Sequence, residues 1–117
     1  MTEALARLRA GERLRRRAEF QKVYERGFRV RARYSTIFLL PNNQPAARLG
    51  IAATKKLGGA VQRNRAKRLI REVFRRNKVA AGLDVVVVPR RELLEASLTA
   101  LETEYRNALA RRRPQQP

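Results

Sequence analysis

The chain of 117 residues contains no cysteine and no histidine, and it has only 10 acidic residues against 28 basic ones. Without cysteine there can be no disulfide, thiolate nucleophile or cysteine-ligated zinc. Without histidine the commonest general base and the commonest metal ligand are missing. These two absences exclude a Ser-His-Asp triad, a zinc finger and a histidine-based nuclease. A chain without cysteine is also compatible with a reducing cytoplasm.

Long apolar runs are missing as well. The first thirty residues are basic and contain no apolar stretch of signal-peptide length. The longest apolar stretches, at residues 37–40 and 85–88, are far too short to cross a bilayer. We therefore expect a soluble, cytoplasmic protein with no membrane association. A length of 117 residues with 44% hydrophobic residues is enough for one domain with its own core.

Because acidic residues are few, the formal net charge is +18 at pH 7. Self-repulsion of this size is tolerated when a polyanion neutralises it, so nucleic acid is the first candidate partner and an anionic membrane surface the second. Residues 26–71 contain 12 basic residues and no acidic one, whereas residues 84–104 hold five of the ten carboxylates. The middle of the chain is therefore expected to form the polyanion-binding surface. A solvated basic face without a partner is the alternative.

Hydrophobic periodicity predicts an α+β fold with the element order α-β-β-α-β-α. The helix at 18–26 is expected to end at Gly27 with a positive φ. Residues 33–40 and 49–54 are expected to form a hairpin around the turn at 41–45. The continuous apolar run at 85–88 predicts a strand buried on both faces and parallel to a neighbour. The other predicted elements are the helices at 60–78 and 92–110, the latter with the core stripe Leu94, Leu98, Leu101, Tyr105 and Leu109.

The helix predicted at 60–78 has two different faces. Its apolar face comprises Ala66, Leu69, Ile70, Val73 and Phe74. Its other face is almost purely cationic and comprises Asn64, Lys67, Arg68, Arg71, Arg75 and Lys78. A helix stabilised by its own ion pairs would alternate charges four residues apart, whereas Glu72 alone interrupts the cations. Phosphate binding is the favoured interpretation, and a solvated face is the alternative.

The segment before this helix, residues 54–60, contains Lys55, Lys56, Gly58 and Gly59. Small residues let backbone N–H groups approach an anion, and a helix N-terminus adds unpaired donors. The segment lacks the P-loop pattern. A phosphate contact on RNA and a tight turn that merely needs glycine are both open.

Three aromatic residues, Phe20, Tyr24 and Phe38, form a second candidate site. Phe20 and Tyr24 are four residues apart on the first predicted helix, and Phe38 lies in the first predicted strand. Core packing is the usual role of such a pair. Basic residues are interleaved with the aromatics, which suggests instead a platform on which unpaired bases stack. These basic residues include Arg13, Arg15 and Lys22.

The run TKKLGGAVQRNRAKRLIREVF at residues 54–74 resembles the signature of the protein subunit of bacterial ribonuclease P. The segment RLRRRAEFQKVYERG at 13–27 resembles the basic segment and first helix of the same family. The resemblance implies a small, about four-stranded mixed sheet with a left-handed β-α-β crossover, like the second domain of ribosomal protein S5. We expect a single RNA-binding domain at 13–112, a flexible N-terminal extension at 1–12 and a tail at 113–117.

The resemblance also implies a function. The protein would bind a large catalytic RNA and precursor tRNA, one protein for each RNA, and the complex would remove the 5′ leader. Mg²⁺ held mainly by the RNA would carry the chemistry, so no residue of this chain is expected to be catalytic or to bind a metal. The cleft expected to hold the leader comprises Phe20, Tyr24, Phe38, Arg13, Arg15 and Lys22. The residues expected to bind the catalytic RNA are Lys55, Lys56, Arg63, Asn64, Arg65, Lys67, Arg68 and Arg71.

Two alternatives to this function differ in what they predict. A ribosomal protein or another non-catalytic RNA-binding module would share the charge and the α+β pattern but would alter no cleavage rate. A protein-only nuclease would need clustered acidic metal ligands, and the carboxylates of this chain lie mostly at the termini and in the last predicted helix.

Overall fold

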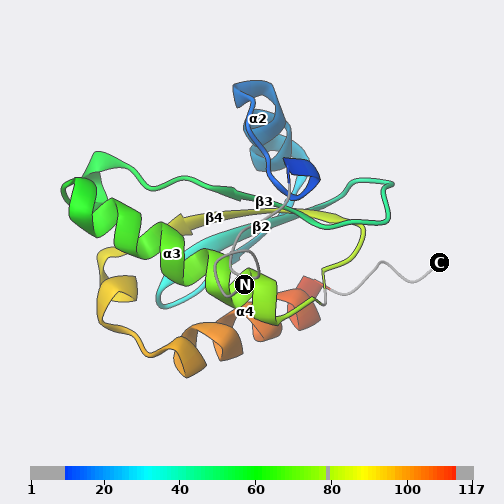
Figure 1. Cartoon of the computed structure of the whole chain (residues 1–117). Helices are drawn as coiled ribbons and strands as arrows, with labels where there is room; N and C mark the ends of the chain where they lie inside the picture. Colours follow the sequence, from blue (N-terminus) through cyan, green and yellow to red (C-terminus); the bar gives the residue numbers. More distant parts are fainter. Residues whose placement is uncertain (1–9, 79, 113–117) are drawn as a thin grey trace.

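The structure, a computed structural model, describes residues 10–78 and 80–112 and contains a four-stranded mixed sheet. The strands lie in the order β1-β2-β4-β3. Helix α2 covers one face of the sheet, and α3 and α4 cover the other (Figure 1). The strands are β1 (Phe28–Arg31), β2 (Ser35–Pro41), β3 (Arg48–Ile51) and β4 (Leu83–Pro89). The helices are α2 (Arg17–Arg26), α3 (Ala60–Arg76) and α4 (Leu98–Arg112), with 3-10 turns at Ala10–Glu12, Lys55–Leu57 and Arg91–Glu95.

The two faces of the sheet have separate apolar clusters, because side chains alternate along each strand. Val85 and Val87 of β4 belong to the large core under α3 and α4, and Val86 belongs to a smaller cluster with Leu14 and Val23 on the α2 side. The central strand β4 is thus buried on both faces and runs parallel to β3, as its apolar run predicts.

The large core also confirms the two predicted helix stripes. Ala66, Ile70, Val73 and Phe74 of α3 are buried, as are Leu101 and Tyr105 of α4. Leu69, Leu94, Leu98 and Leu109 are partly buried against the same cluster. No helix among the described residues is long and apolar enough to cross a membrane.

Three details of the sequence-based prediction are wrong. β2 and β3 do not form a hairpin, because β4 lies between them and pairs antiparallel with β2 and parallel with β3. The prediction also misses β1, whose arginines surround the single buried Val30. The predicted helix at 92–110 is a 3-10 turn followed by α4, which begins at Leu98.

Gly27 ends α2 for a different reason from the one predicted. Its φ is −78°, which any residue adopts. A Cβ at this position would clash with the carbonyl oxygen of Val23 and would lie 3.1 Å from that of Leu39. Glycine is therefore needed because α2 turns into β1 against the backbone of β2.

The predicted domain boundaries concern segments that the structure covers only in part. Residues 10–12 form a 3-10 turn. The rest of the predicted extension at 1–12 and the whole predicted tail at 113–117 lie outside the described residues.

Helix α2 is held to the sheet by a polar cluster, here called the Asp84 network, of Glu19, Asn42, Arg48 and Asp84. Arg48 donates to both carboxylate oxygens of the buried Asp84, at 2.8 and 2.7 Å, and Asn42 donates to Asp84 at 2.9 Å. Arg48 also donates to Glu19 Oε2 at 3.2 Å. The other oxygen of Glu19 accepts the backbone N–H groups of Arg15 and Arg16 at the start of α2.

Replacing Asp84 with alanine is expected to lower the free energy of unfolding by about 3 to 5 kcal/mol, because it removes the bidentate partner of the largely buried Arg48 guanidinium and leaves only the longer bond to Glu19. Chemical denaturation measures this change. Glu72→Ala is the control, since it breaks more exposed ion pairs with Arg75 and Arg76 and should cost about 1 kcal/mol or less. Equal losses in the two variants would contradict the structural role of the Asp84 network.

The stability should also depend on Glu19 in acid. The backbone N–H groups of Arg15 and Arg16, and then Arg48, lower the pKa of Glu19 from its ordinary value of 4.5. The stabilisation from Glu19 is therefore complete above pH 4.5 and is lost as the pH falls through the lowered folded pKa. Denaturation across this range should show wild type and Glu19→Gln converging as the pH falls. A constant difference between them would exclude this linkage.

Candidate nucleic-acid interface

The sheet face beside α2 carries the predicted leader site, and the part of this face that α2 leaves uncovered is called the cleft here. Paired residues of neighbouring strands point to the same face. Arg29, Phe38, Val86 and Gly50 therefore form one row across β1, β2, β4 and β3. The next row on this face lies two residues further along the strands and comprises Arg31, Thr36 and Val88. Helix α2 crosses the strands along the first row and forms a wall of the cleft.

Phe20 and Tyr24 of α2 line this wall. The ring centroids of Tyr24 and Phe38 lie 5.0 Å apart in an edge-to-face arrangement, and those of Phe20 and Tyr24 lie 6.5 Å apart. Tyr24 is 39% exposed, whereas Phe20 and Phe38 are half-buried. Partial burial raises the pKa of the Tyr24 phenol, which favours its neutral form. The three predicted aromatics thus form one group that is accessible from solvent.

Phe20 sits directly on the backbone of β3. A Cβ at residue 50 would lie 2.7 Å from Phe20 Cζ, so Gly50 provides the space for this ring. One edge of Phe20 is therefore packed as core while the ring also borders the cleft. Core packing and a role as a stacking platform are therefore compatible at Phe20.

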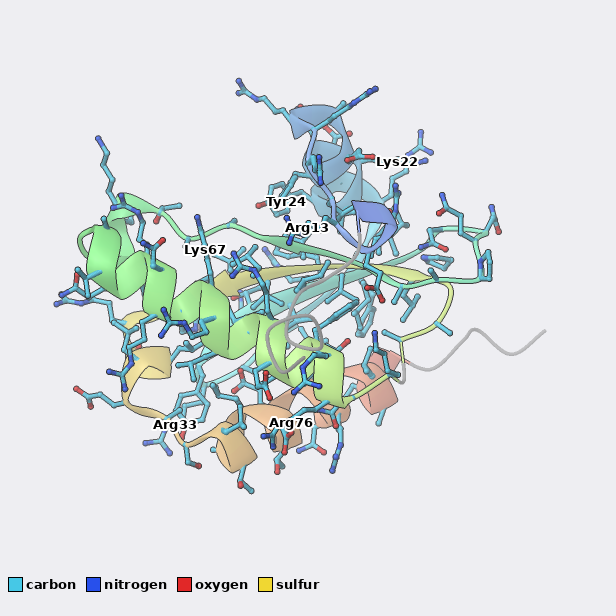
Figure 2. The ribbon with its side chains drawn as sticks, viewed as in Figure 1. Arg13, Lys22, Tyr24, Arg33, Lys67 and Arg76 are labelled. Atoms are coloured by element: carbon cyan, nitrogen blue, oxygen red, sulfur yellow. The ribbon has the colours of Figure 1, made fainter. Side chains whose placement is uncertain are left out.

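A cationic hollow of about 170 Å³ adjoins Phe20 between the N-terminal segment and α3. Arg13, Lys67 and Arg71 line it together with the apolar side chains of Leu14, Phe20, Leu49 and Ile51. Burial, and then the neighbouring Arg13 and Arg68, lower the pKa of Arg71. Arg13, Tyr24 and Lys67 are all drawn around the space between α2 and α3 (Figure 2). Lys67 and Arg71, predicted to bind the catalytic RNA, therefore border the aromatic cleft as well.

The outer side of α3 is a separate cationic surface. Asn64, Arg65 and Arg68 are exposed there, and neither arginine forms an ion pair within the described part of the chain. Further along the same helix, Arg75 and Arg76 are bound to Glu72. The cations without acidic partners are thus concentrated toward the first half of α3.

The segment before α3 is shaped by Gly58 and Arg63. Gly58 has a φ of 143°, which strongly favours glycine, and Arg63 donates to its carbonyl oxygen at 2.9 Å. Leu57 is buried, while Lys55 and Lys56 immediately before it are exposed to solvent. Gly58 therefore serves a tight turn, and this turn presents two lysines next to the start of α3. Arg63 partly fixes the turn.

Two predicted cleft residues lie away from the aromatics. Lys22 lies on the side of α2 opposite Tyr24, because residues two apart on a helix differ by about 200° (Figure 2). Arg15 precedes α2 and is exposed, with its backbone N–H bound to Glu19. Conversely, Arg29 and Arg31 lie on the cleft face but are absent from the predicted site. The alternation of these two arginines with the apolar Val30 was the sequence pattern that could have predicted this placement.

Acidic residues do not form a metal site in the described part of the chain. No three of them gather in a cluster of the kind that could hold a metal ion. Glu19, Glu72 and Asp84 are bound to arginines, and Glu104 accepts hydrogen bonds from the Tyr34 backbone and the Ser35 hydroxyl. These carboxylates therefore take part in contacts that stabilise the fold.

A family model described as Ribonuclease P matches residues 8–113. The curated ribonuclease P protein component of Thermotoga maritima is 40% identical over 97 residues, which cover 81% of this chain and 80% of that protein. The component from Desulfovibrio desulfuricans is 43% identical over 90 residues, which cover 74% and 69%.

Solved structures give the same relationship. The ribonuclease P protein of Thermotoga maritima superposes with a TM-score of 0.76 at 36% identity, covering 86% of this chain and 96% of that one. The protein from Staphylococcus aureus superposes with a TM-score of 0.73 at 32% identity, covering 85% and 93%. The four-stranded mixed sheet and the element order agree with these structures.

These matches favour one of the alternatives left open by the sequence, because the family model and the relatives are all ribonuclease P proteins. The chain belongs to the family of bacterial ribonuclease P protein components, the protein subunits of an endoribonuclease whose RNA is catalytic and which removes the 5′ leaders of precursor tRNAs.

Proposed function

We propose that this subunit binds the ribonuclease P RNA through α3 and holds the single-stranded leader of precursor tRNA in the cleft beside α2. The observation that supports this division best is the arrangement of the cleft. An accessible aromatic group, Phe20, Tyr24 and Phe38, adjoins three cations, Arg13, Lys67 and Arg71, that have no carboxylate partner among the described residues. Stacking on aromatics combined with phosphate contacts is how proteins bind single strands with little base preference.

The surface proposed for the catalytic RNA is the outer side of α3 and the turn before it. It comprises Lys55, Lys56, Arg63, Asn64, Arg65 and Arg68, with Lys67 and Arg71 between this surface and the cleft. One protein would bind each RNA. Arg15 lies near the start of α2 and contributes positive charge, as does Lys22 on the far side of that helix.

In this proposal the phosphodiester is hydrolysed with the help of Mg²⁺ that the RNA subunit holds. A bound Mg²⁺ can activate water and stabilise the leaving oxygen of a phosphodiester. The residues of this chain bind and orient the substrate, and their positive charge screens nearby phosphates, which raises the apparent affinity for Mg²⁺. The complex would act in the cytoplasm on newly made precursor tRNA.

Changing Arg65 and Arg68 together to alanine should weaken association with the RNA subunit, because neither alanine can neutralise a phosphate. The slope of log affinity against log salt should decrease by about 0.7 to 0.9 for each phosphate that is no longer neutralised. The thermal melt should change little, since both side chains are exposed. Cleavage of precursor tRNA is then measured with the protein alone, with the RNA alone and with both together. The variant should activate cleavage by the RNA only at a higher protein concentration than wild type.

The matched control is Arg76→Ala with Arg111→Ala. This variant removes the same charge from the last turns of α3 and α4, and α4 covers the face of the sheet opposite α2 (Figure 1). Equal loss of RNA affinity in the two double variants would mean that net charge, and not the α3 surface, determines binding.

Tyr24→Ala tests the leader cleft. Tyr24 is the most exposed member of the aromatic group, so this variant should fold with little loss of stability. It should lose about 1 to 3 kcal/mol of affinity for leader-bearing precursor, because a base can no longer stack on the ring. Affinity of the reconstituted enzyme for mature tRNA should hardly change. Equal losses for precursor and mature tRNA would refute leader binding at this position.

A further inference from the structure

The large core between the sheet and the helices α3 and α4 contains a small cavity, here called the Tyr105 cavity. Most of the side chains around it are apolar members of that core, such as Ile37, Ile70, Val73 and Val87. Its volume is about 30 Å³. A water molecule needs roughly 10 to 15 Å³ of such space. The cavity therefore has room for one or two water molecules and is too small for an organic ligand.

Three polar side chains line this apolar cavity as well: Ser35 of β2, and Glu104 and Tyr105 of α4. The hydroxyl of Tyr105 is buried and has no hydrogen-bond partner among the described residues. The residue is only 4% exposed, so bulk solvent does not reach the hydroxyl either. Burying a hydroxyl without a hydrogen bond is unfavourable, and phenylalanine would fill the same space without that cost. The Tyr105 hydroxyl therefore needs a partner that the described side chains do not supply.

Ser35 and Glu104 have hydrogen-bonding capacity left for such a partner. Ser35 donates from Oγ to Glu104 Oε2 at 2.8 Å, and the backbone N–H of Tyr34 donates to Glu104 Oε1 at 2.9 Å. A carboxylate accepts about four hydrogen bonds, and a serine hydroxyl accepts two in addition to the one that it donates. Both side chains can therefore accept a further hydrogen bond from a molecule in the cavity.

The phenol of Tyr105 is in the protonation state that donates. Burial raises the pKa of Tyr105 well above the ordinary value of 10, so the hydroxyl keeps its proton at neutral pH. A neutral phenol donates one hydrogen bond, whereas Ser35 and Glu104 offer acceptors. An occupant must therefore accept a hydrogen bond on one side and donate one on the other. Water does both and fits the volume.

We propose that the Tyr105 cavity is a binding site for one or two ordered water molecules, which accept a hydrogen bond from Tyr105 and donate one to Ser35 or Glu104. The water completes a buried polar chain that joins α4 to the beginning of β2. Thr36 and Phe38 of the same strand lie on its opposite face, so this chain supports β2 from behind the cleft. A buried polar network in which every group is satisfied makes its surroundings rigid.

Tyr105→Phe tests the site through stability. Phenylalanine removes only the hydroxyl and keeps the ring, so the variant should fold. The equilibrium constant of unfolding should rise by about twofold to tenfold, which is the usual effect of losing one hydrogen bond. Chemical denaturation of the full chain measures this change. A variant that is as stable as wild type, or more stable, would overturn the proposal, because it would show that the hydroxyl has no bound partner.

Tyr34→Phe is the matched control. Tyr34 is only partly buried and takes part in the polar chain through its backbone N–H, which the substitution keeps. Loss of its hydroxyl should therefore leave the unfolding equilibrium nearly unchanged. If Tyr34→Phe lowered the stability as much as Tyr105→Phe does, the effect would not depend on the cavity and the assignment to Tyr105 would be wrong.

The bound water can also be detected directly by nuclear magnetic resonance. In the wild-type protein, magnetisation should pass from a long-lived water molecule to the ring protons of Tyr105. The same transfer should be weakened or lost in Tyr105→Phe and retained in Tyr34→Phe. Absence of this transfer in the wild-type protein would overturn the proposal whatever the denaturation experiments show.

Discussion

The bidentate ion pair between Arg48 and Asp84 is the interaction on which the cleft depends. It joins the parallel strands β3 and β4, and through Glu19 it also holds the beginning of α2. Helix α2 has a single fully buried residue, Val23, so apolar burial alone positions it weakly. Phe20 and Tyr24 keep their place above the sheet because the Asp84 network fixes the helix that carries them. A buried pair with full hydrogen bonding is well suited to this role, since its geometry is directional where apolar packing is not.

The distribution of the few carboxylates explains how a protein of charge +18 keeps a defined binding face. Glu19 and Asp84 are bound to Arg48, and Glu72 is bound to Arg75 and Arg76. These acids stabilise the docking of α2 and the last turns of α3. The described cations around the cleft and on the outer side of α3 are left without acidic partners, so their charge is available to a polyanion. A larger number of acids would stabilise the isolated protein but would compete with phosphate for the same guanidinium groups.

The sequence predicted much of the fold and only part of the site. Val85 to Val88 and the stripes of α3 and α4 were recognisable because periodicity reports burial directly. The parallel pairing of β3 with β4 was implied by the resemblance, through its β-α-β crossover, and not by the two strands themselves, since it depends on a long-range contact across α3. The strand β1 was missed because it has one buried side chain and three exposed ones. For the same reason Arg29 and Arg31 were not placed on the cleft. Residue type alone also could not separate Lys22 from Tyr24, which helix geometry puts on opposite sides.

The interposition of β4 between β2 and β3 has a functional consequence. If β2 and β3 formed the expected hairpin, the turn at 41–45 would join neighbouring strands and β3 would lie next to Phe38. Instead β4 lies between Gly50 and Phe38, with Val86 buried under α2 and Val88 partly exposed beside Thr36. The sheet beside α2 is thereby one strand wider, and the cationic hollow at β3 adjoins Phe20 and not Phe38. In the proposed function, this wider face accommodates several nucleotides of an extended strand. Recognition of an extended, single-stranded shape in this way requires no catalytic side chain.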